Sequence, residues 1–203
     1  MGIPYVTFMK HAEKVTKKAS ASRPTLKGVY HAEDGSLAVT DSHRLYYATD
    51  AHQRQDAAIL DPKTGEEIGG AYPDVTRLLP YPGDARYTLT IDDIPKALKI
   101  VKALEALGKS VDSDGTITIK ADENGAVSFG MEAEGTSGTV EIGRVSGGTY
   151  ENVAVSAQYL SEALALFKDI GVTSVQINSY GKIRPLTLTI DGLTALIMPV
   201  RKF

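Results

Sequence analysis

Several chemically capable side chains stand in a row near the start of the chain, in the stretch TDSHRLYY from Thr40 to Tyr47. Asp41, Ser42 and His43 have the residue types of a hydrolytic triad. Consecutive residues on a strand or turn point in alternating directions, so these three cannot face one another as such a relay requires. The stretch is therefore not expected to be catalytic, and its role must follow from the elements around it.

Other kinds of chemistry also lack a sequence signal. The histidines His11, His31, His43 and His52 show no HExxH or paired ligand spacing, so no metal site is expected. The absence of Cys excludes disulfides, thiolate nucleophiles and Cys-ligated zinc. No GxxxxGK[ST] motif occurs, and no GxGxxG follows a strand, which leaves nucleotide binding unsupported. The sequence thus predicts a non-enzymatic protein without a cofactor.

Composition places the chain among soluble globular proteins of one or two domains. It has 203 residues, of which 42% are hydrophobic and 23% charged. No apolar run approaches the ~18 residues that a membrane span needs, and the N-terminal segment lacks a signal-peptide core, so a cytoplasmic protein is expected. The net charge of -3 argues against a uniformly basic nucleic-acid binder.

A helix followed by antiparallel strands recurs three times along the chain, which predicts an α+β repeat architecture. The helices are expected at about residues 7–19, from a Thr90–Asp93 capping box to about residue 107, and at 157–169 after the N-cap Ser156. Turns between strands are expected at Asp34-Gly35, Asn124-Gly125 and Asp191-Gly192. Residues 51–84 are rich in Gly and Pro and predict a long connection with one short strand.

Two of the three expected helices carry lysines along one face, opposite an apolar face. The lysines are Lys10, Lys14, Lys17 and Lys18 in the first helix and Lys96, Lys99 and Lys102 in the second. The third helix does not share this pattern. Such a stripe either binds a polyanion or is the solvated side of a surface helix, and spacing alone leaves both interpretations open.

Three separate stretches, RPTLKG with TDSHRL, YPDVTRLL, and LIMPVR, resemble segments of bacterial DNA polymerase III sliding clamps (the β subunit), in the same order. The resemblance implies DNA-clamp-like repeats of one helix plus antiparallel strands, amounting to about one and a half clamp domains. Residues 1–58 would form half of a clamp domain like the first half of domain 2, residues 59–84 a connecting segment, and residues 85–203 a full domain like domain 3.

The resemblance also implies a pocket in which clamps bind short peptides of polymerases, clamp loaders and repair proteins. By motif position its residues are Leu26, Thr40, Ser42, His43, Arg44, Leu45, Pro73, Arg77, Leu78, Leu196, Met198 and Val200. Ser42 stands where Gly is usual, and Lys202-Phe203 extends past the usual ending.

The side chains of this implied pocket divide into two kinds. The leucines and Met198 would form an apolar cavity, ringed by donors from His43, Arg44 and Arg77. Burial of one or two peptide side chains at ~1.5 to 3 kcal/mol each, less the ordering cost, suggests micromolar affinity. The alternative for His43 and Arg44 is that they are strand residues paired with local acids.

In the family, basic helices contact duplex DNA through phosphate charge alone, so the lysine stripes would bind DNA independently of sequence, with Arg54 a weaker candidate. The main interpretation is a shortened, phage- or mobile-element-like clamp homologue that promotes polymerase processivity. It is expected to be a homo-oligomer, since the half domain could pair with that of a second copy across a two-fold axis. The alternative is a non-encircling decoy or adaptor that binds or sequesters host replication proteins.

Overall fold

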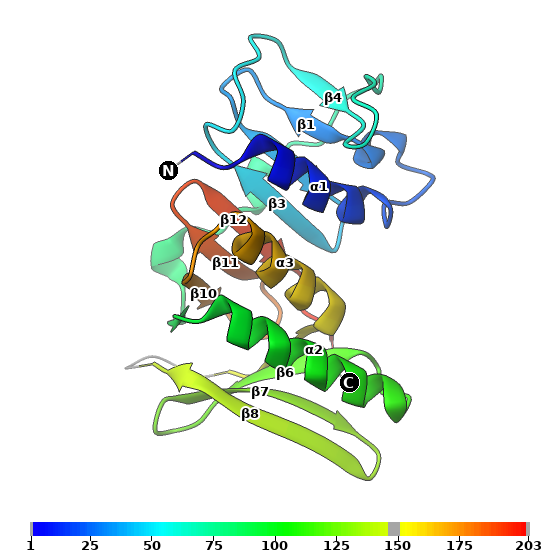
Figure 1. Ribbon diagram of the computed structural model, residues 1–203. Coiled ribbons are helices and arrows are strands. Elements are labelled where there is room, and N and C mark those ends of the chain that lie inside the picture. The colour runs from blue at the N-terminus through cyan, green and yellow to red at the C-terminus, as the bar shows by residue number, and fades with distance from the viewer. Residues whose placement is uncertain (1, 146–150, 202–203) are drawn as a thin grey trace. The chain divides into compact units, whose positions relative to one another are not determined.

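The computed structural model describes residues 2–145 and 151–201, and its chain divides into two compact units (Figure 1). Unit 1 comprises Met1–Pro80 and Ile190–Leu196, and unit 2 comprises Tyr81–Thr189 and Ile197–Phe203. The chain therefore leaves unit 1 after Pro80, builds most of unit 2, returns to unit 1 for residues 190–196, and ends in unit 2. Both units combine helices with antiparallel strands, which confirms the predicted α+β class.

Unit 1 is a helix packed on a sheet with the strand order β4-β1-β2-β3-β12. Its elements are α1 (Tyr5–Thr16), η1 (Pro24–Lys27), β1 (Val29–His31), β2 (Leu37–Thr40), β3 (Arg44–Ala48), β4 (Ala58–Leu60), η2 (Thr76–Leu78) and most of β12 (Leu193–Ile197). The strand β4 is the one short strand expected within residues 51–84. Gly35 takes a left-handed φ of 84° in the turn between β1 and β2, where a side chain would be strained.

The two faces of the unit 1 sheet have different coverings. On one face α1 places Phe8, Ala12 and Val15, none of which is exposed to solvent. On the other face Tyr30, Ala38 and Tyr47 lie side by side, because the strand register pairs Tyr30 with Ala38 and Ala38 with Tyr47. The second face is covered by part of the connection between β4 and unit 2 and carries the candidate site.

Unit 2 contains α2 and α3 in contact with each other, together with two groups of strands in the orders β8-β7-β6-β9 and β11-β10-β5. Figure 1 shows α2 lying along the β6–β8 sheet. The elements are η3 (Pro82–Asp84), β5 (Tyr87–Ile91), α2 (Ile94–Ser110), β6 (Thr116–Ala121), β7 (Ala126–Ala133), β8 (Thr136–Arg144), β9 (Val153–Ser156), α3 (Ala157–Asp169), β10 (Val175–Ser179) and β11 (Leu186–Ile190).

The helix boundaries agree with the sequence expectation in one case and differ in two. Ser156 caps α3 as predicted, its hydroxyl accepting from the Tyr159 N–H at 3.4 Å. The capping box at Thr90 is wrong: Thr90 lies in β5, and Asp93 caps α2 by accepting from the Lys96 N–H at 2.8 Å. The helix α1 begins at Tyr5 and ends at Thr16, earlier at both ends than expected.

A buried histidine joins α1 to the sheet of unit 1. The Nδ1 of His31 is 3.1 Å from the Val29 carbonyl oxygen, and its Nε2 is 2.9 Å from the Tyr5 hydroxyl. Because a carbonyl only accepts, Nδ1 carries the proton and neutral Nε2 accepts from Tyr5. Burial, opposed by the Val29 hydrogen bond and helped by the nearby His52 and Arg54, lowers the pKa of His31 from 6.5 to about 4.

Acidification is therefore expected to destabilise the fold through His31. The unfolded chain takes up a proton below pH 6.5 while folded His31 stays neutral to about pH 4, so the stability falls across this interval. Between pH 7 and pH 5 the loss from this residue is about 2 kcal/mol. Urea denaturation of the wild-type chain and of His31→Gln at both pH values measures it. Equal pH dependence in the two proteins would show that His31 contributes nothing.

Candidate functional site

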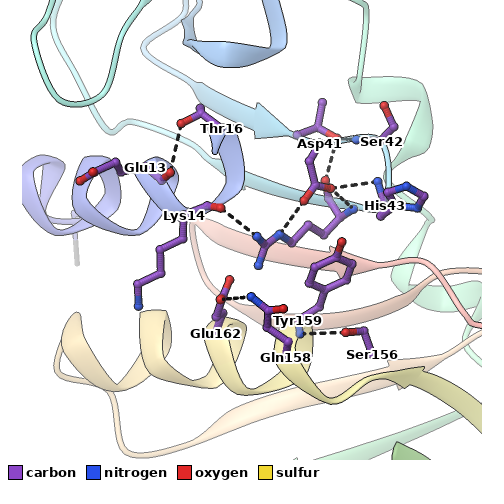
Figure 2. Close-up of polar contacts among 12 residues, drawn as sticks. Glu13, Lys14, Thr16, Asp41, Ser42, His43, Ser156, Gln158, Tyr159 and Glu162 are labelled. Atoms are coloured by element: carbon purple, nitrogen blue, oxygen red, sulfur yellow. Dashed lines mark hydrogen bonds and ion pairs between the residues drawn. The ribbon is translucent and has the colours of Figure 1, made fainter. Parts of the chain in front are cut away.

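The turn between β2 and β3 is built around the carboxylate of Asp41. Its Oδ1 accepts from the backbone N–H groups of His43 and Arg44, both at 3.0 Å, and its Oδ2 accepts from Arg44 Nε at 3.0 Å (Figure 2). A second guanidinium nitrogen of Arg44 donates to the Lys14 carbonyl oxygen in α1 at 3.1 Å. Asp41 thus holds the turn and directs Arg44 towards the helix.

This arrangement changes the interpretation of Arg44. The resemblance implied that Arg44 is a donor at the surface of the site. However, the side chains of Asp41 and Arg44 are both 0% exposed, so Arg44 cannot donate there. It is instead paired with a local acid, which is the alternative that the sequence left open. His43 is exposed, and its backbone N–H rather than its ring is what binds Asp41. Arg44 therefore positions the turn that presents His43.

Ser42, which stands where the family pattern has Gly, is exposed and has a φ of 79°. Its N–H donates to Thr40 Oγ1 at 3.1 Å, and its hydroxyl accepts from Arg23 at 2.9 Å. A residue with a Cβ pays about 1 kcal/mol for the left-handed conformation.

Ser42→Gly is therefore expected to leave the stability unchanged or to raise it by up to about 1 kcal/mol, because the relieved strain offsets the lost Arg23 hydrogen bond and the greater freedom of the unfolded chain. Thermal or urea unfolding measures the change. A loss above 1 kcal/mol would mean that the Arg23–Ser42 contact outweighs the strain. Ser36→Gly, at a buried position whose φ is not positive, is the matched control and is expected to destabilise.

On the face of the unit 1 sheet that is not covered by α1, a buried apolar cluster joins three distant parts of the sequence. It comprises Ala38, Leu45, Val75 and Leu196, each at most 4% exposed. Tyr30, Tyr47, Tyr72 and Leu79 pack against it while partly buried. The cluster brings together the β2–β3 hairpin, the YPDVTRLL segment and β12, and it includes Leu45 and Leu196 of the residues that the resemblance implied.

Tyr72 ties the YPDVTRLL segment to the sheet. Its hydroxyl accepts from the Thr40 N–H at 3.1 Å, and its ring stacks on Tyr30 with centroids 5.3 Å apart and an interplanar angle of 9°. Burial raises the pKa of the Tyr72 hydroxyl far above its usual value of 10.0, so it stays protonated. The ring thereby fixes the start of the segment that carries Pro73, Arg77 and Leu78.

The other residues implied by the resemblance have the following places. Pro73, Arg77 and Leu78 are exposed, Leu78 by 54%, and lie in the segment that carries Val75 and Leu79; Arg77 is paired with Asp74 at 2.8 Å. Leu26 is buried in η1, and the hydroxyl of buried Thr40 donates to the Arg44 carbonyl oxygen. Met198 and Val200 are exposed by 40% and 37% and belong to unit 2. Lys202 and Phe203 lie outside the described residues.

Sequence reasoning missed Ala38 and Val75 of the cluster, and Tyr72, which packs against it. Val75 and Tyr72 lie inside the YPDVTRLL motif, but Tyr72 was not assigned a role, because its two partners lie 32 and 42 residues away in the chain. Alternation of apolar and polar residues along a strand is the usual signal that would have indicated which face of the sheet Ala38 occupies. However, all residues of β2 are buried, which removes the usual contrast between two faces of a strand.

The lysines of the two stripes are all exposed. Lys10 and Lys14 lie in α1, Lys17 is its C-cap residue and Lys18 follows, whereas Lys96, Lys99 and Lys102 lie in α2. Lys17 is paired with Glu13 at 2.6 Å, and Arg54 with Asp56 at 2.7 Å. Lys10, Lys14, Lys96 and Lys99 make no ion pair with any described residue, so their charges are available to a polyanion.

Within the described ranges, no group of three or more His, Asp and Glu side chains is placed to hold a metal ion. None of the helices there has both the length and the apolarity to cross a membrane. The polar geometry of the candidate site holds a turn in place, and the apolar cluster with its exposed edge is suited to contact another chain.

The fold defined by these elements is that of the bacterial DNA sliding clamps. Solved structures similar to this chain include the Bacillus subtilis DNA polymerase sliding clamp, with a TM-score of 0.78 and 18% identity over 99% of this chain. The DNA polymerase III β chain of Streptococcus pneumoniae matches with a TM-score of 0.78 and 22% identity over 97%. The Helicobacter pylori β clamp, solved bound to a DNA ligase peptide, matches with a TM-score of 0.75 and 19% identity over 98% of this chain.

This chain spans less than two thirds of those clamps, namely 64% of the B. subtilis and H. pylori chains and 63% of the S. pneumoniae chain. No protein-family model and no curated protein matches the sequence. The identities are low enough that the comparison establishes the shared fold, and the activity has to be argued from the residues of this chain.

Proposed function

We propose that this protein is a clamp-like, non-catalytic binding protein that takes short peptides of DNA polymerases and other replication proteins at the edge of the cluster in unit 1. The observation that carries the proposal is the meeting of Leu45, Val75 and Leu196 in one buried cluster. Exposed Leu78 directly precedes Leu79, which packs against this cluster. The H. pylori clamp, which has this fold, binds a DNA ligase peptide. An aliphatic or aromatic side chain of a partner would cover Leu78 and extend the cluster.

The roles of the proposed residues follow from their exposure. Pro73 and Leu78 offer apolar contact, and Arg77 and His43 offer donors to the carbonyl and carboxylate groups of a peptide. Leu26, Thr40, Ser42 and Arg44 shape the turn and the adjoining backbone. Met198 and Val200, which are exposed residues of unit 2, are assigned to peptide binding by the family pattern alone.

We further propose that the lysine stripes on α1 and α2 contact duplex DNA through its phosphates. The supporting observation is that lysines on both helices are exposed and unpaired, while acidic residues lie mainly in strands and loops. Such contacts carry no sequence preference and weaken as the salt concentration rises.

Charge reversal tests the DNA contact. The variant with Lys10→Glu, Lys14→Glu, Lys96→Glu and Lys99→Glu is expected to bind duplex DNA at least tenfold more weakly at about 100 mM salt. The slope of log K against log salt should fall by about 3 to 4, because each lost phosphate contact removes about 0.9. Fluorescence anisotropy with a labelled duplex at several salt concentrations measures both quantities.

The control for this variant carries the same net charge change elsewhere, at Lys27, Lys63, Lys168 and Lys182. All four of these lysines are exposed. If both variants lose equal affinity, only the net charge matters and the stripes have no special role. If the unmodified chain does not bind DNA, the second candidate function is favoured, in which the chain is a non-encircling decoy or adaptor that binds replication proteins through its peptide site.

A homo-oligomer also remains a proposal. The large exposed hydrophobic residues described in unit 1 are Tyr5, Val6 and Leu78, and Tyr5 and Val6 begin α1. Pairing of two copies through the exposed start of α1 would cover these two side chains. Light scattering across a concentration series decides whether such a pair forms.

A further inference from the structure

A hollow lies on the face of the unit 1 sheet that carries the buried cluster. It shares Ala38 and Val75 with that cluster, and its lining includes Pro73, which is assigned to the peptide site. Its volume is about 300 Å³. Its walls include the rings of Tyr30, Tyr47 and Tyr72, and its rim includes the carboxylates of Asp34 and Asp74. We call it the tyrosine hollow.

The walls of the tyrosine hollow are held in place before any ligand arrives. Tyr30 and Tyr72 stack on each other, and the hydroxyl of Tyr72 is bound by the Thr40 N–H. The hydroxyl of Tyr47 donates to Ser36 Oγ at 3.1 Å. Rings that are fixed in this way lose little conformational entropy when a ligand binds against them.

The rim of the hollow is negatively charged. The Ser36 N–H donates to Asp34 Oδ1 at 2.9 Å, and this backbone hydrogen bond lowers the pKa of Asp34, so the carboxylate is ionised at neutral pH. Asp74 is also ionised but is already bound by Arg77 and Thr76. None of the residues that line the hollow is Lys, Arg or His. Asp34 therefore brings a charge to the rim that no lining cation neutralises.

We propose that the tyrosine hollow binds an arginine side chain of a partner protein. A guanidinium group stacks on tyrosine rings and pairs with a carboxylate, which matches the two kinds of group present. An anion would be repelled by Asp34, and a purely apolar side chain would strip water from that carboxylate without replacing it. The inference goes beyond the proposed peptide site because it concerns a charged side chain of the partner, although the hollow shares Ala38 and Val75 with the buried cluster.

The tyrosine hollow lies close to the proposed peptide site, which limits how far the arginine can be from the peptide-site residue in the partner's sequence. Pro73 lines the tyrosine hollow and is also a proposed peptide-site residue. Tyr72 forms a wall of the hollow and fixes the segment that carries Leu78. A partner segment that covers Leu78 can therefore reach the hollow with an arginine a few residues away.

The test uses two small probes of equal shape, Nα-acetyl-arginine amide and Nα-acetyl-citrulline amide, which differ in charge. Titration of the ¹⁵N-labelled chain followed by two-dimensional NMR should show the arginine probe shifting the amide signals of Asp34, Ser36 and Ala38, with millimolar affinity for so small a ligand. The citrulline probe should bind at least fivefold more weakly. Asp34→Asn should reduce binding of the arginine probe to the level of citrulline.

The matched control is Asp56→Asn, which removes an exposed carboxylate of unit 1 outside the hollow and should leave the titration unchanged. Equal affinity of the two probes, tighter binding of Nα-acetyl-leucine amide, or shifts absent from the hollow would each overturn the proposal. Because the arginine and citrulline probes end in polar groups and lack the apolar anchor expected at the peptide site, failure of the arginine probe is distinct from failure of a peptide to bind at Leu78.

Discussion

Replacing Asp41 by Asn is expected to lower the free energy of unfolding by about 3 to 5 kcal/mol. The substitution keeps the size of the side chain but removes the charge that faces Arg44 Nε at 3.0 Å. Both side chains are fully buried, so the substitution removes a full negative charge that faces the guanidinium in the interior. The hydrogen bonds that hold His43 and Arg44 in the turn would weaken at the same time. Urea denaturation at neutral pH measures the loss.

Two companion variants separate this mechanism from a general loss of charge. Asp56→Asn breaks an exposed pair with Arg54 and should cost less than about 1 kcal/mol. Adding Arg44→Met to Asp41→Asn removes the buried guanidinium as well and should recover part of the loss. The interpretation is contradicted if Asp41→Asn costs less than 1 kcal/mol, or if the double variant is no more stable than the single one.

Leu78→Asp is expected to weaken binding of a clamp-binding peptide at least tenfold while changing the stability by no more than about 0.5 kcal/mol. The side chain is 54% exposed, so the folded chain loses little when it becomes polar. A bound peptide would cover it, and the lost apolar burial is worth about 1.5 to 3 kcal/mol before the cost of desolvating the new carboxylate. Anisotropy of a labelled peptide and urea denaturation provide the two readouts.

Ile183 supplies the control for that prediction, since it is an exposed aliphatic residue of unit 2 with no place in the proposed site. It is 72% exposed, and Ile183→Asp should leave peptide affinity unchanged. If both substitutions weaken binding equally, the effect comes from the added negative charge. If neither does, the peptide binds elsewhere on the chain.

Much of the fold follows from local signals in the sequence. The N-cap Ser156 and the apolar spacing of residues 157–169 define α3, and the turn at Asn124-Gly125 separates β6 from β7. The Thr90 boundary failed because two residues near the start of α2, Thr90 and Asp93, both have capping side chains. Pairing of Thr90 with Gln176 in the sheet places it in β5 and leaves Asp93 as the cap.

The candidate site was less predictable, because its key contacts join distant parts of the chain. Motif position indicated Leu45, Leu78 and Leu196, and two of these meet in the buried cluster. It did not show that Arg44 turns towards the Lys14 carbonyl oxygen, 30 residues earlier, since that contact requires α1 to lie on the sheet. The charge of Arg44 indicated a surface donor, whereas the three-dimensional arrangement made it a buried positioning residue.

Experiments on DNA binding and peptide binding distinguish the two candidate functions. A clamp-like protein should show both peptide binding and salt-dependent DNA binding, whereas a decoy should show the first alone.

Titration of the unmodified chain with a labelled peptide that carries aliphatic and aromatic side chains, such as the DNA ligase peptide bound by the H. pylori clamp, is the most direct test. The account predicts saturable binding with a Kd in the micromolar range, abolished or weakened at least tenfold by Leu78→Asp. Binding absent at millimolar peptide, or equally tight to the Leu78→Asp chain, would contradict the claim that the cluster of Leu45, Val75 and Leu196 supports a peptide site.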